Sequence, residues 1–170
     1  MSDSISKVKF QTTAGDFTIE LYADKAPITV KNFLTYVEEG FFAGTIFHRI
    51  IPGFMAQGGG FDVDFVQKET HGMIKIEADN GLKNDRGTLA MARTNVPDSA
   101  TAQFFINYKD NNFLNYSSPT SQGWGYTVFG KVIEGMETID EMEKVPTGNH
   151  NGHQDVPKSN IVIESATIIE

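Results

Sequence analysis

The sequence contains no cysteine among its 170 residues. Disulfide bonds, thiol nucleophiles and cysteine-ligated zinc sites are therefore excluded, and the composition favours neither an oxidising nor a reducing compartment. The sequence also has no basic N-terminal segment followed by an apolar one, and no apolar run approaches the roughly 20 residues that span a bilayer. We therefore expect a cytoplasmic protein that does not bind membranes.

Positive charge is scarce, because 14 Lys+Arg stand against 22 Asp+Glu and give a formal net charge of −8. This balance opposes binding to nucleic acids and anionic lipids unless basic residues cluster, and the sequence shows no basic cluster. We interpret the acidic pairs Glu38/Glu39 and Glu141/Glu143 as solvated faces of helices. We therefore expect no nucleic-acid partner.

What the sequence does contain is a repeated strand pattern. Thirteen phenylalanines and sixteen glycines indicate large side chains packed on a sheet with many tight turns. Short runs rich in apolar residues, bounded by Gly, Pro, Asn or Ser, predict eight strands. These runs lie in VKFQTTAGDFTIELY, which holds two strands, and in TIFHRII, GFMAQ, GTLAMAR, QFFINYK, YTVFGKVI and IVIESATIIE.

Two segments have a helical period instead. In APITVKNFLTYVEEG apolar residues recur at helical spacing from Val30 to Val37, and in GMETIDEMEKV they recur at intervals of three from Met136 to Met142. Eight strands with two helices fit repeated βαβ units poorly, whereas a closed barrel removes exposed edges and leaves its ends for the helices. We predict a β-barrel in a single domain over residues 1–170.

The two faces of two predicted strands differ in character. In TLAMAR, Leu89 and Met91 fall on one face and Ala90 on the other, so one face is bulky and the other small. In QFFINYK, Phe104 and Phe105 point in opposite directions. We expect the bulky face to line the core, and if Phe104 points into the barrel, Phe105 stands outside it.

The stretch FHRIIPGFMAQGGGF places a charged residue, Arg49, in an otherwise apolar hairpin. An unpaired charge inside a barrel costs several kcal/mol, so Arg49 should lie on the outer face. Arg49, Gln57, Gln103 and Phe105 can then share one exterior surface. An arginine taken alone is more often a surface ion-pair partner than a catalytic group.

Three other patterns have structural explanations. His48 lies on the face opposite Arg49, which favours a satisfied core histidine over a general base. The run Gly58–Gly60 fits neither phosphate-binding pattern, so turn or close-packing glycines are expected. His150 and His153 with Asp155 have a spacing compatible with adventitious metal binding, but we expect no native metal.

The stretches FHRIIPGFMAQGGGF, GTLAMART, SATAQFFIN and WGYTVFGKVIEGME closely resemble the cyclophilins, the cyclosporin-binding class of peptidyl-prolyl cis/trans isomerases. The resemblance covers nearly the whole chain, and EADNGLKNDRGTLAMART looks most like the single-domain bacterial B-type enzymes. It implies a mainly β fold, a closed eight-stranded antiparallel β-barrel capped by two α-helices, with a substrate groove on the outside. It also implies isomerase activity on X-Pro bonds of peptides and unfolded proteins, assisting their folding without a cofactor.

The resemblance also assigns roles to residues of this sequence. It makes Arg49 the catalytic residue. The implied proline pocket consists of Phe54, Met55, Phe105 and Leu114. The implied contacts of the flanking peptide are Gln57, Ala92, Arg93 and Gln103, with Arg93 acting mainly through its backbone.

Two positions of the implied substrate site depart from the best-known eukaryotic pattern. Phe113 stands where that pattern has a tryptophan in the drug-binding groove, and Tyr126 stands where it has a histidine at the edge of the pocket. Because phenylalanine lacks the indole N–H donor, we expect weakened cyclosporin binding with isomerase activity retained.

Two functions of other classes stay open. A binding module or chaperone would hold proline-containing segments without important turnover, and a ligand-carrying barrel would need a hollow interior, against which the bulky alternating side chains argue. The intact set of Arg49, Phe54, Gln57 and Phe105 favours the enzyme. The expected partners are proline-containing peptides and unfolded chains, and we expect a monomer.

Overall fold

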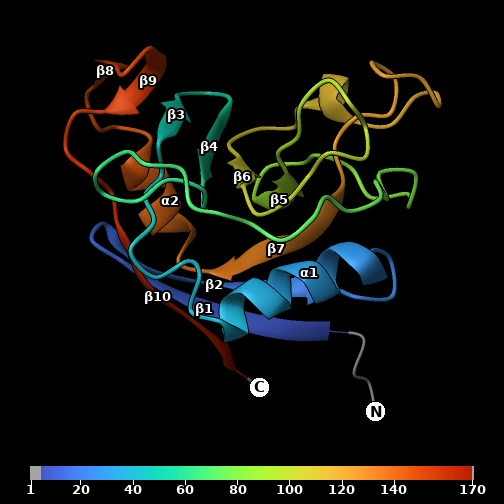
Figure 1. Cartoon of the computed structure of the whole chain (residues 1–170), viewed down its shortest axis with the longest axis horizontal. Helices are drawn as coiled ribbons and strands as arrows, with labels where there is room; N and C mark the ends of the chain where they lie inside the picture. Colours follow the sequence, from blue (N-terminus) through green and yellow to red (C-terminus); the bar gives the residue numbers. More distant parts are fainter. Residues whose placement is uncertain (1–4, 170) are drawn as a thin grey trace.

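The computed structural model describes residues 5–169, except for the side chain of Ile5. Eight strands form one sheet in the order β10-β1-β2-β7-β5-β6-β4-β3, and every pair in it is antiparallel (Figure 1). These strands are β1 (Ile5–Thr12), β2 (Gly15–Tyr22), β3 (Arg49–Ile51), β4 (Met55–Gly58), β5 (Thr88–Met91), β6 (Phe104–Asn107), β7 (Val128–Glu134) and β10 (Ile163–Ile169). The mainly β fold and the eight strands are confirmed.

The sheet curls strongly, and irregular backbone joins its two edges. The edge strands β3 and β10 do not pair with each other as strands. Instead, Ile46 and Val162 form an isolated antiparallel bridge, and the Phe47 N–H donates to the Ile161 carbonyl at 3.0 Å. The seam of the barrel therefore lies just before β3 and just before β10.

Two helices accompany the sheet, as expected. Helix α1 (Pro27–Glu38) begins with proline in its first turn and buries Val30, Phe33 and Val37, and it lies against β2 and β10. Helix α2 (Met136–Met142) buries Ile139 and lies against β2. A 3-10 turn, η1 (Asn112–Leu114), follows β6. No helix within residues 5–169 is long and apolar enough to cross a membrane.

A second, separate hairpin was not predicted from the sequence. It consists of β8 (Thr147–His150) and β9 (His153–Pro157), which pair only with each other. The hairpin lies against β3, so it stands beside the edge of the main sheet that carries Arg49 (Figure 1).

The buried apolar side chains form two clusters on opposite faces of the sheet. The inner cluster includes Leu89, Met91 and Phe104 together with most of the buried phenylalanines, which fill the inside of the barrel. The outer cluster includes Ala90 and Phe105. Both predictions from period two are confirmed, and the filled interior argues against a ligand-carrying barrel.

A chain of asparagines connects the loops over the outer cluster to β6. Asn107 donates from Nδ2 to Asn84 Oδ1 at 3.1 Å and accepts on Oδ1 a bond from Asn111 Nδ2 at 2.8 Å. Asn84 donates from Nδ2 to the Leu114 carbonyl at 3.1 Å and from its backbone N–H to Asn115 Oδ1 at 2.6 Å. Buried amides are costly without partners, so this network fixes the loops around the outer cluster.

Asn84→Ala should lower the free energy of unfolding by about 2 kcal/mol, because it leaves buried partners of the carboxamide unsatisfied. Urea denaturation measures the loss. Asn160→Ala is the matched control, since its carboxamide donates to the Val63 carbonyl at the surface, and it should change the free energy by about 0.5 kcal/mol or less. Equal losses in the two variants would contradict a special role for the buried network.

Candidate active site

One row of paired residues crosses the outer face of the sheet. Arg49 on β3 pairs with Gln57 on β4, Gln57 pairs with Phe105 on β6, and Phe105 pairs with Ala90 on β5. Directly paired residues of neighbouring strands point to the same face with their Cβ atoms about 5 Å apart. The strand register therefore places a guanidinium, an amide and an aromatic ring side by side.

Arg49 is exposed and its guanidinium is free. Within residues 5–169, no hydrogen bond or ion pair involves its side chain. The common role of a surface arginine as an ion-pair partner is therefore not the role of Arg49. Its donors are available to a ligand on the outer face.

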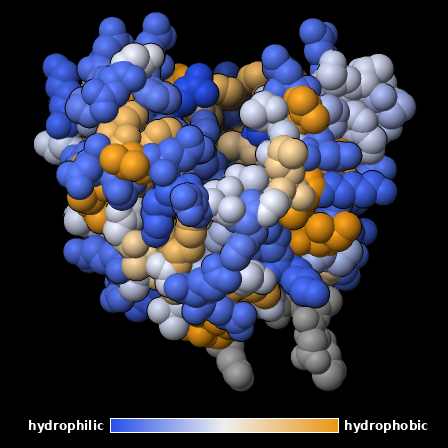
Figure 2. Space-filling view, viewed as in Figure 1, coloured by the Kyte–Doolittle hydropathy of each residue, from blue (hydrophilic) through white to orange (hydrophobic). Residues whose placement is uncertain are grey.

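An apolar cluster lies along the same row. Met55, Phe105 and Leu114 are buried in the outer cluster, and Phe54 and Tyr126 pack against them. The structure thus brings together the four residues of the predicted proline pocket. Figure 2 shows the molecule hollowed at its upper side, where Figure 1 draws the β3–β4 region and η1.

Phe113 and Tyr126 flank this apolar cluster. The Phe113 ring stacks on Phe54 with 5.6 Å between centroids, and Phe113 is 71% exposed. The Tyr126 ring meets Phe105 edge-on at 5.6 Å, and the Arg93 guanidinium lies 4.8 Å from the Tyr126 ring centre. An exposed aromatic ring beside an apolar pocket provides a surface on which a ligand can pack.

The predicted contacts of the flanking peptide lie beside this row. Gln57 donates from Nε2 to Gln103 Oε1 at 2.9 Å, and Ala92 donates from its N–H to the Gln103 carbonyl at 3.0 Å. Ala92, Arg93 and Gln103 line a hollow with a cavity volume of about 440 Å³. The Arg93 side chain donates to the carbonyls of Gly125 and Ser121, so it holds a loop and leaves its backbone for a ligand.

The glycine run Gly58–Gly60 leaves room for the Gln103 side chain that lines this hollow. A Cβ on Gly60 would lie 2.4 Å from Cγ of Gln103, and Gly59 has a φ of +89°, which disfavours other residues. A side chain at Gly60 would displace Gln103 from its bond to Gln57. The expectation of close-packing glycines is therefore confirmed, and the close packing positions a site residue.

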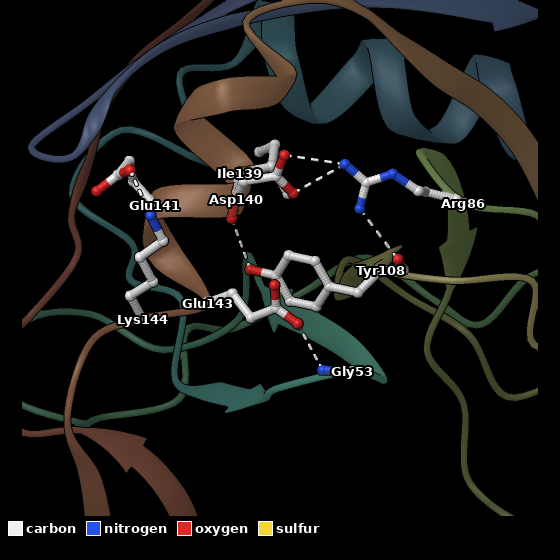
Figure 3. A network of polar contacts seen from close by, with 8 residues as sticks. All are labelled: Gly53, Arg86, Tyr108, Ile139, Asp140, Glu141, Glu143 and Lys144. Atoms are coloured by element: carbon white, nitrogen blue, oxygen red, sulfur yellow. Dashed lines mark hydrogen bonds and ion pairs between the residues drawn. The ribbon is translucent and has the colours of Figure 1, made fainter.

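Hydrogen bonds to distant parts of the chain hold the turn that carries Phe54 in place. The Gly53 N–H donates to Glu143 Oε2 at 2.5 Å (Figure 3). The Phe54 carbonyl accepts bonds from the Tyr108 N–H and from Asn111 Nδ2, each at 2.9 Å. Glu143, which was expected on a solvated face, is half-buried and also holds this turn. The hydrogen bond joins residues 90 positions apart, and no local pattern predicts such a contact.

Helix α2 is itself tied to the sheet at this point (Figure 3). Arg86 donates to Asp140 at 2.9 Å and to the Tyr108 carbonyl at 3.1 Å, and the Tyr108 hydroxyl donates to the Ile139 carbonyl at 2.8 Å. Burial, reinforced by nearby acidic groups, raises the pKa of Tyr108, so the hydroxyl stays protonated and keeps donating. The turn before Phe54 is thus braced by a helix that is itself held in place.

His48 lies beside Arg49 in sequence but is buried, as expected. His48 is 4% exposed, but its Nδ1 has no hydrogen-bond partner within residues 5–169, so the expectation of a satisfied histidine is wrong in that respect. Burial, followed by the charges of His153 and Arg49, lowers the pKa of His48 to about 4. Among the described residues, no group of three or more His, Asp or Glu is placed to hold a metal ion.

Comparison with known proteins gives a consistent family. The model of the family described as cyclophilin type peptidyl-prolyl cis-trans isomerase/CLD matches residues 7–168. The chain is 59% identical over 163 residues to peptidyl-prolyl cis-trans isomerase B of Escherichia coli strain K12, covering 96% of this chain and 99% of that protein. It is 58% identical to peptidyl-prolyl cis-trans isomerase cyp18 of Streptomyces antibioticus, covering 97% and 99% of the two chains.

Solved structures agree with the sequence comparison. The crystal structure of a cyclophilin type peptidyl-prolyl cis-trans isomerase of Cryptosporidium parvum has a TM-score of 0.78 at 32% identity and covers 98% of both chains. The family match and these relatives extend over both helices and all eight strands of the main sheet. The chain therefore belongs to the cyclophilins and is a cyclophilin-type peptidyl-prolyl cis/trans isomerase.

Proposed function

We propose that the outer groove binds X-Pro segments of peptides and unfolded protein chains and that Arg49 is its catalytic residue. The proline ring occupies the pocket of Phe54, Met55, Phe105 and Leu114. The observation that carries this proposal is the strand row that sets a free guanidinium beside an apolar pocket.

The reaction needs no covalent chemistry. Rotation about an X-Pro bond faces a barrier of roughly 18–20 kcal/mol because it breaks amide resonance, yet it makes and breaks no covalent bond. If the uncatalysed rate is about 0.01 s⁻¹, a turnover of about 10³ s⁻¹ requires about 10⁵-fold acceleration, or roughly 7 kcal/mol. The site must supply this through interactions that strengthen when the bond is twisted.

Arg49 supplies such an interaction. In the twisted state the prolyl nitrogen loses conjugation and becomes a pyramidal hydrogen-bond acceptor, so a fixed guanidinium gains a bond that the planar ground state lacks. Arginine stays protonated and presents several donors from a planar head. Gln57, its neighbour in the row, is itself held by a hydrogen bond to Gln103.

The remaining residues hold the substrate on either side of the rotating bond. The apolar pocket grips the ring and excludes water, which strengthens the contact with Arg49. Ala92, Arg93 and Gln103 hold the flanking peptide, Arg93 through its backbone, and Phe113 and Tyr126 bound the pocket. A related Cryptosporidium parvum enzyme, 32% identical with a TM-score of 0.77, was crystallised in the presence of the dipeptide Ala-Pro, which supports a small residue before proline as a test substrate.

Three broader statements stay predictions: a cytoplasmic location, a monomer, and a single domain over residues 1–170. Cyclosporin is a further expected ligand, bound with weakened affinity. The structural reason is Phe113, whose exposed ring offers stacking but no N–H donor.

Arg49→Ala should lower the turnover on an Ala-Pro peptide by at least about 10²-fold, because it removes the donor to the twisted nitrogen. NMR exchange spectroscopy measures cis/trans interconversion with no protein, with the wild type and with the variant at equal concentration. Peptide shift changes should persist, since the apolar pocket is intact. Arg49→Lys is the matched control and should restore little activity, because it keeps the charge without the planar head.

Undiminished exchange in Arg49→Ala would remove Arg49 from catalysis. Exchange no faster than in free peptide with the wild type, despite binding, would leave a module that holds proline segments.

Phe113→Trp should tighten cyclosporin binding by about tenfold, the value of one added hydrogen bond, while isomerase activity changes little. Isothermal titration gives the affinity, and Phe113→Leu, which adds no donor, should show no gain. An unchanged affinity in Phe113→Trp would discard the missing donor as the cause of weak binding.

A further inference from the structure

A second hollow lies beside Arg49, and the β8–β9 hairpin forms one of its walls. Its cavity volume is about 400 Å³. The segment around β3 and β4 lines the hollow with His48, Arg49, Gln57 and Phe61, and Gln103, just before β6, also lines it. The hairpin contributes Gly152, His153 and Gln154. None of these hairpin residues was predicted to belong to the substrate site.

The bonded pair of Gln57 and Gln103 divides this hollow from the one beside Ala92. Both glutamines line both hollows, whereas Arg49 lines only the hollow at the hairpin. A peptide that presents its X-Pro bond to Arg49 therefore has a hollow on each side of the glutamine pair. Each residue of an extended peptide advances by roughly 3.5 Å, so a side chain within two residues of the proline can reach the hairpin.

Three side chains at the hairpin hollow carry hydrogen-bond donors that have no partner among the described residues. Within residues 5–169, no hydrogen bond or ion pair involves the side chains of Arg49, His153 or Gln154. None of the described residues that line the hollow carries a carboxylate. Arg49 is the one residue with a fixed charge among the described residues that line the hollow, and its positive charge favours an anionic acceptor there.

Aromatic packing holds the hairpin wall in place. The His153 ring lies 5.5 Å from the Phe61 ring and 5.1 Å from the Phe65 ring, and β9 lies against β3. His48 beneath them is kept neutral by burial and by the charges of His153 and Arg49, which lower its pKa to about 4. The wall is therefore packed against the segment that carries Arg49, and the exposed His153 and Gln154 line the same hollow as Arg49.

We propose that the hairpin hollow is a subsite for an acidic side chain within two residues of the substrate proline, with His153 and Gln154 as specificity-determining residues. The proposal rests on the function proposed above for the groove. The aspartate or glutamate carboxylate accepts hydrogen bonds from the hairpin groups while Arg49 faces the X-Pro amide. The substrate class preferred by this enzyme is thus proline segments with an adjacent acidic residue.

The test compares matched peptides that carry Glu, Gln or Lys at each position within two residues of one X-Pro bond. NMR exchange spectroscopy gives the catalysed rate and the apparent affinity for each peptide. With the wild type, we expect the best Glu peptide to exceed its Gln counterpart by about fivefold in kcat/KM, mostly through KM, since a partly exposed ion pair contributes about 1 kcal/mol. The Lys peptide should be the poorest.

Variants of the hairpin test whether His153 and Gln154 cause the preference for the Glu peptide. In the double variant His153→Ala/Gln154→Ala the ratio of Glu to Gln should fall to near one. His150→Ala is the matched control, because His150 lies on the same hairpin and its ring also contacts Phe65, at 4.8 Å, but it does not line the hollow. This control should keep the wild-type ratio.

Two measurements on the wild type serve if the double variant does not fold. The Glu preference should shrink as salt rises from about 50 mM to about 500 mM, because exposed charge pairs are screened. The imidazole proton signals of His153, assigned with His153→Gln, should shift more with the Glu peptide than with the Gln peptide. No salt effect and equal shifts would overturn the subsite.

The remaining outcomes separate the two proposals. Equal wild-type rates for Glu and Gln peptides would overturn the acidic subsite and leave the groove function intact. Slower turnover of the Glu peptide would also overturn it, because the carboxylate would then compete with the amide for Arg49. Failure to accelerate any of the peptides would instead contradict the function proposed for the groove.

Discussion

The site depends on the register of four neighbouring strands. Arg49, Gln57, Phe105 and Ala90 lie in one row only because β3, β4, β6 and β5 pair as they do. Side chains alternate with a period of two, so a slip of one residue in β4 would turn Gln57 toward the core and bring Ala56 to the groove. The packed interior enforces the register, because Leu89, Met91 and Phe104 have no room on the other face.

The filled barrel also explains why the chemistry lies outside it. The inner cluster leaves no ligand space, so the loops must build a second, smaller cluster on the outer face. That cluster carries the proline pocket and needs its own supports. The asparagine chain holds the loops, and Glu143 on the C-terminal side of α2 holds the turn before Phe54, so polar groups support the residues of the apolar cluster.

The sequence predicts those parts of the fold and site that follow a local period. Alternation placed Phe104 and Phe105 on opposite faces, the cost of burying a charge placed Arg49 outside, and the helical period located both helices. The roles of the pocket residues came from family resemblance, since a buried Met55 or Leu114 looks like any core residue. Glu143, Asn84 and the barrel seam escaped prediction because their partners are distant in sequence. The β8–β9 hairpin escaped it because TGNH and HQDVP are mostly polar and do not alternate.

The seam of the barrel has a consequence for how the chain folds. Residues before β3 bond to residues 161–163, and β10 pairs with β1, so the two edges of the sheet can close only when the last strand is available. Such long-range pairing is slow to form. A folding catalyst of this design therefore has a slow, non-local step in its own folding, because its groove beside β3 is complete only after the two sheet edges have met.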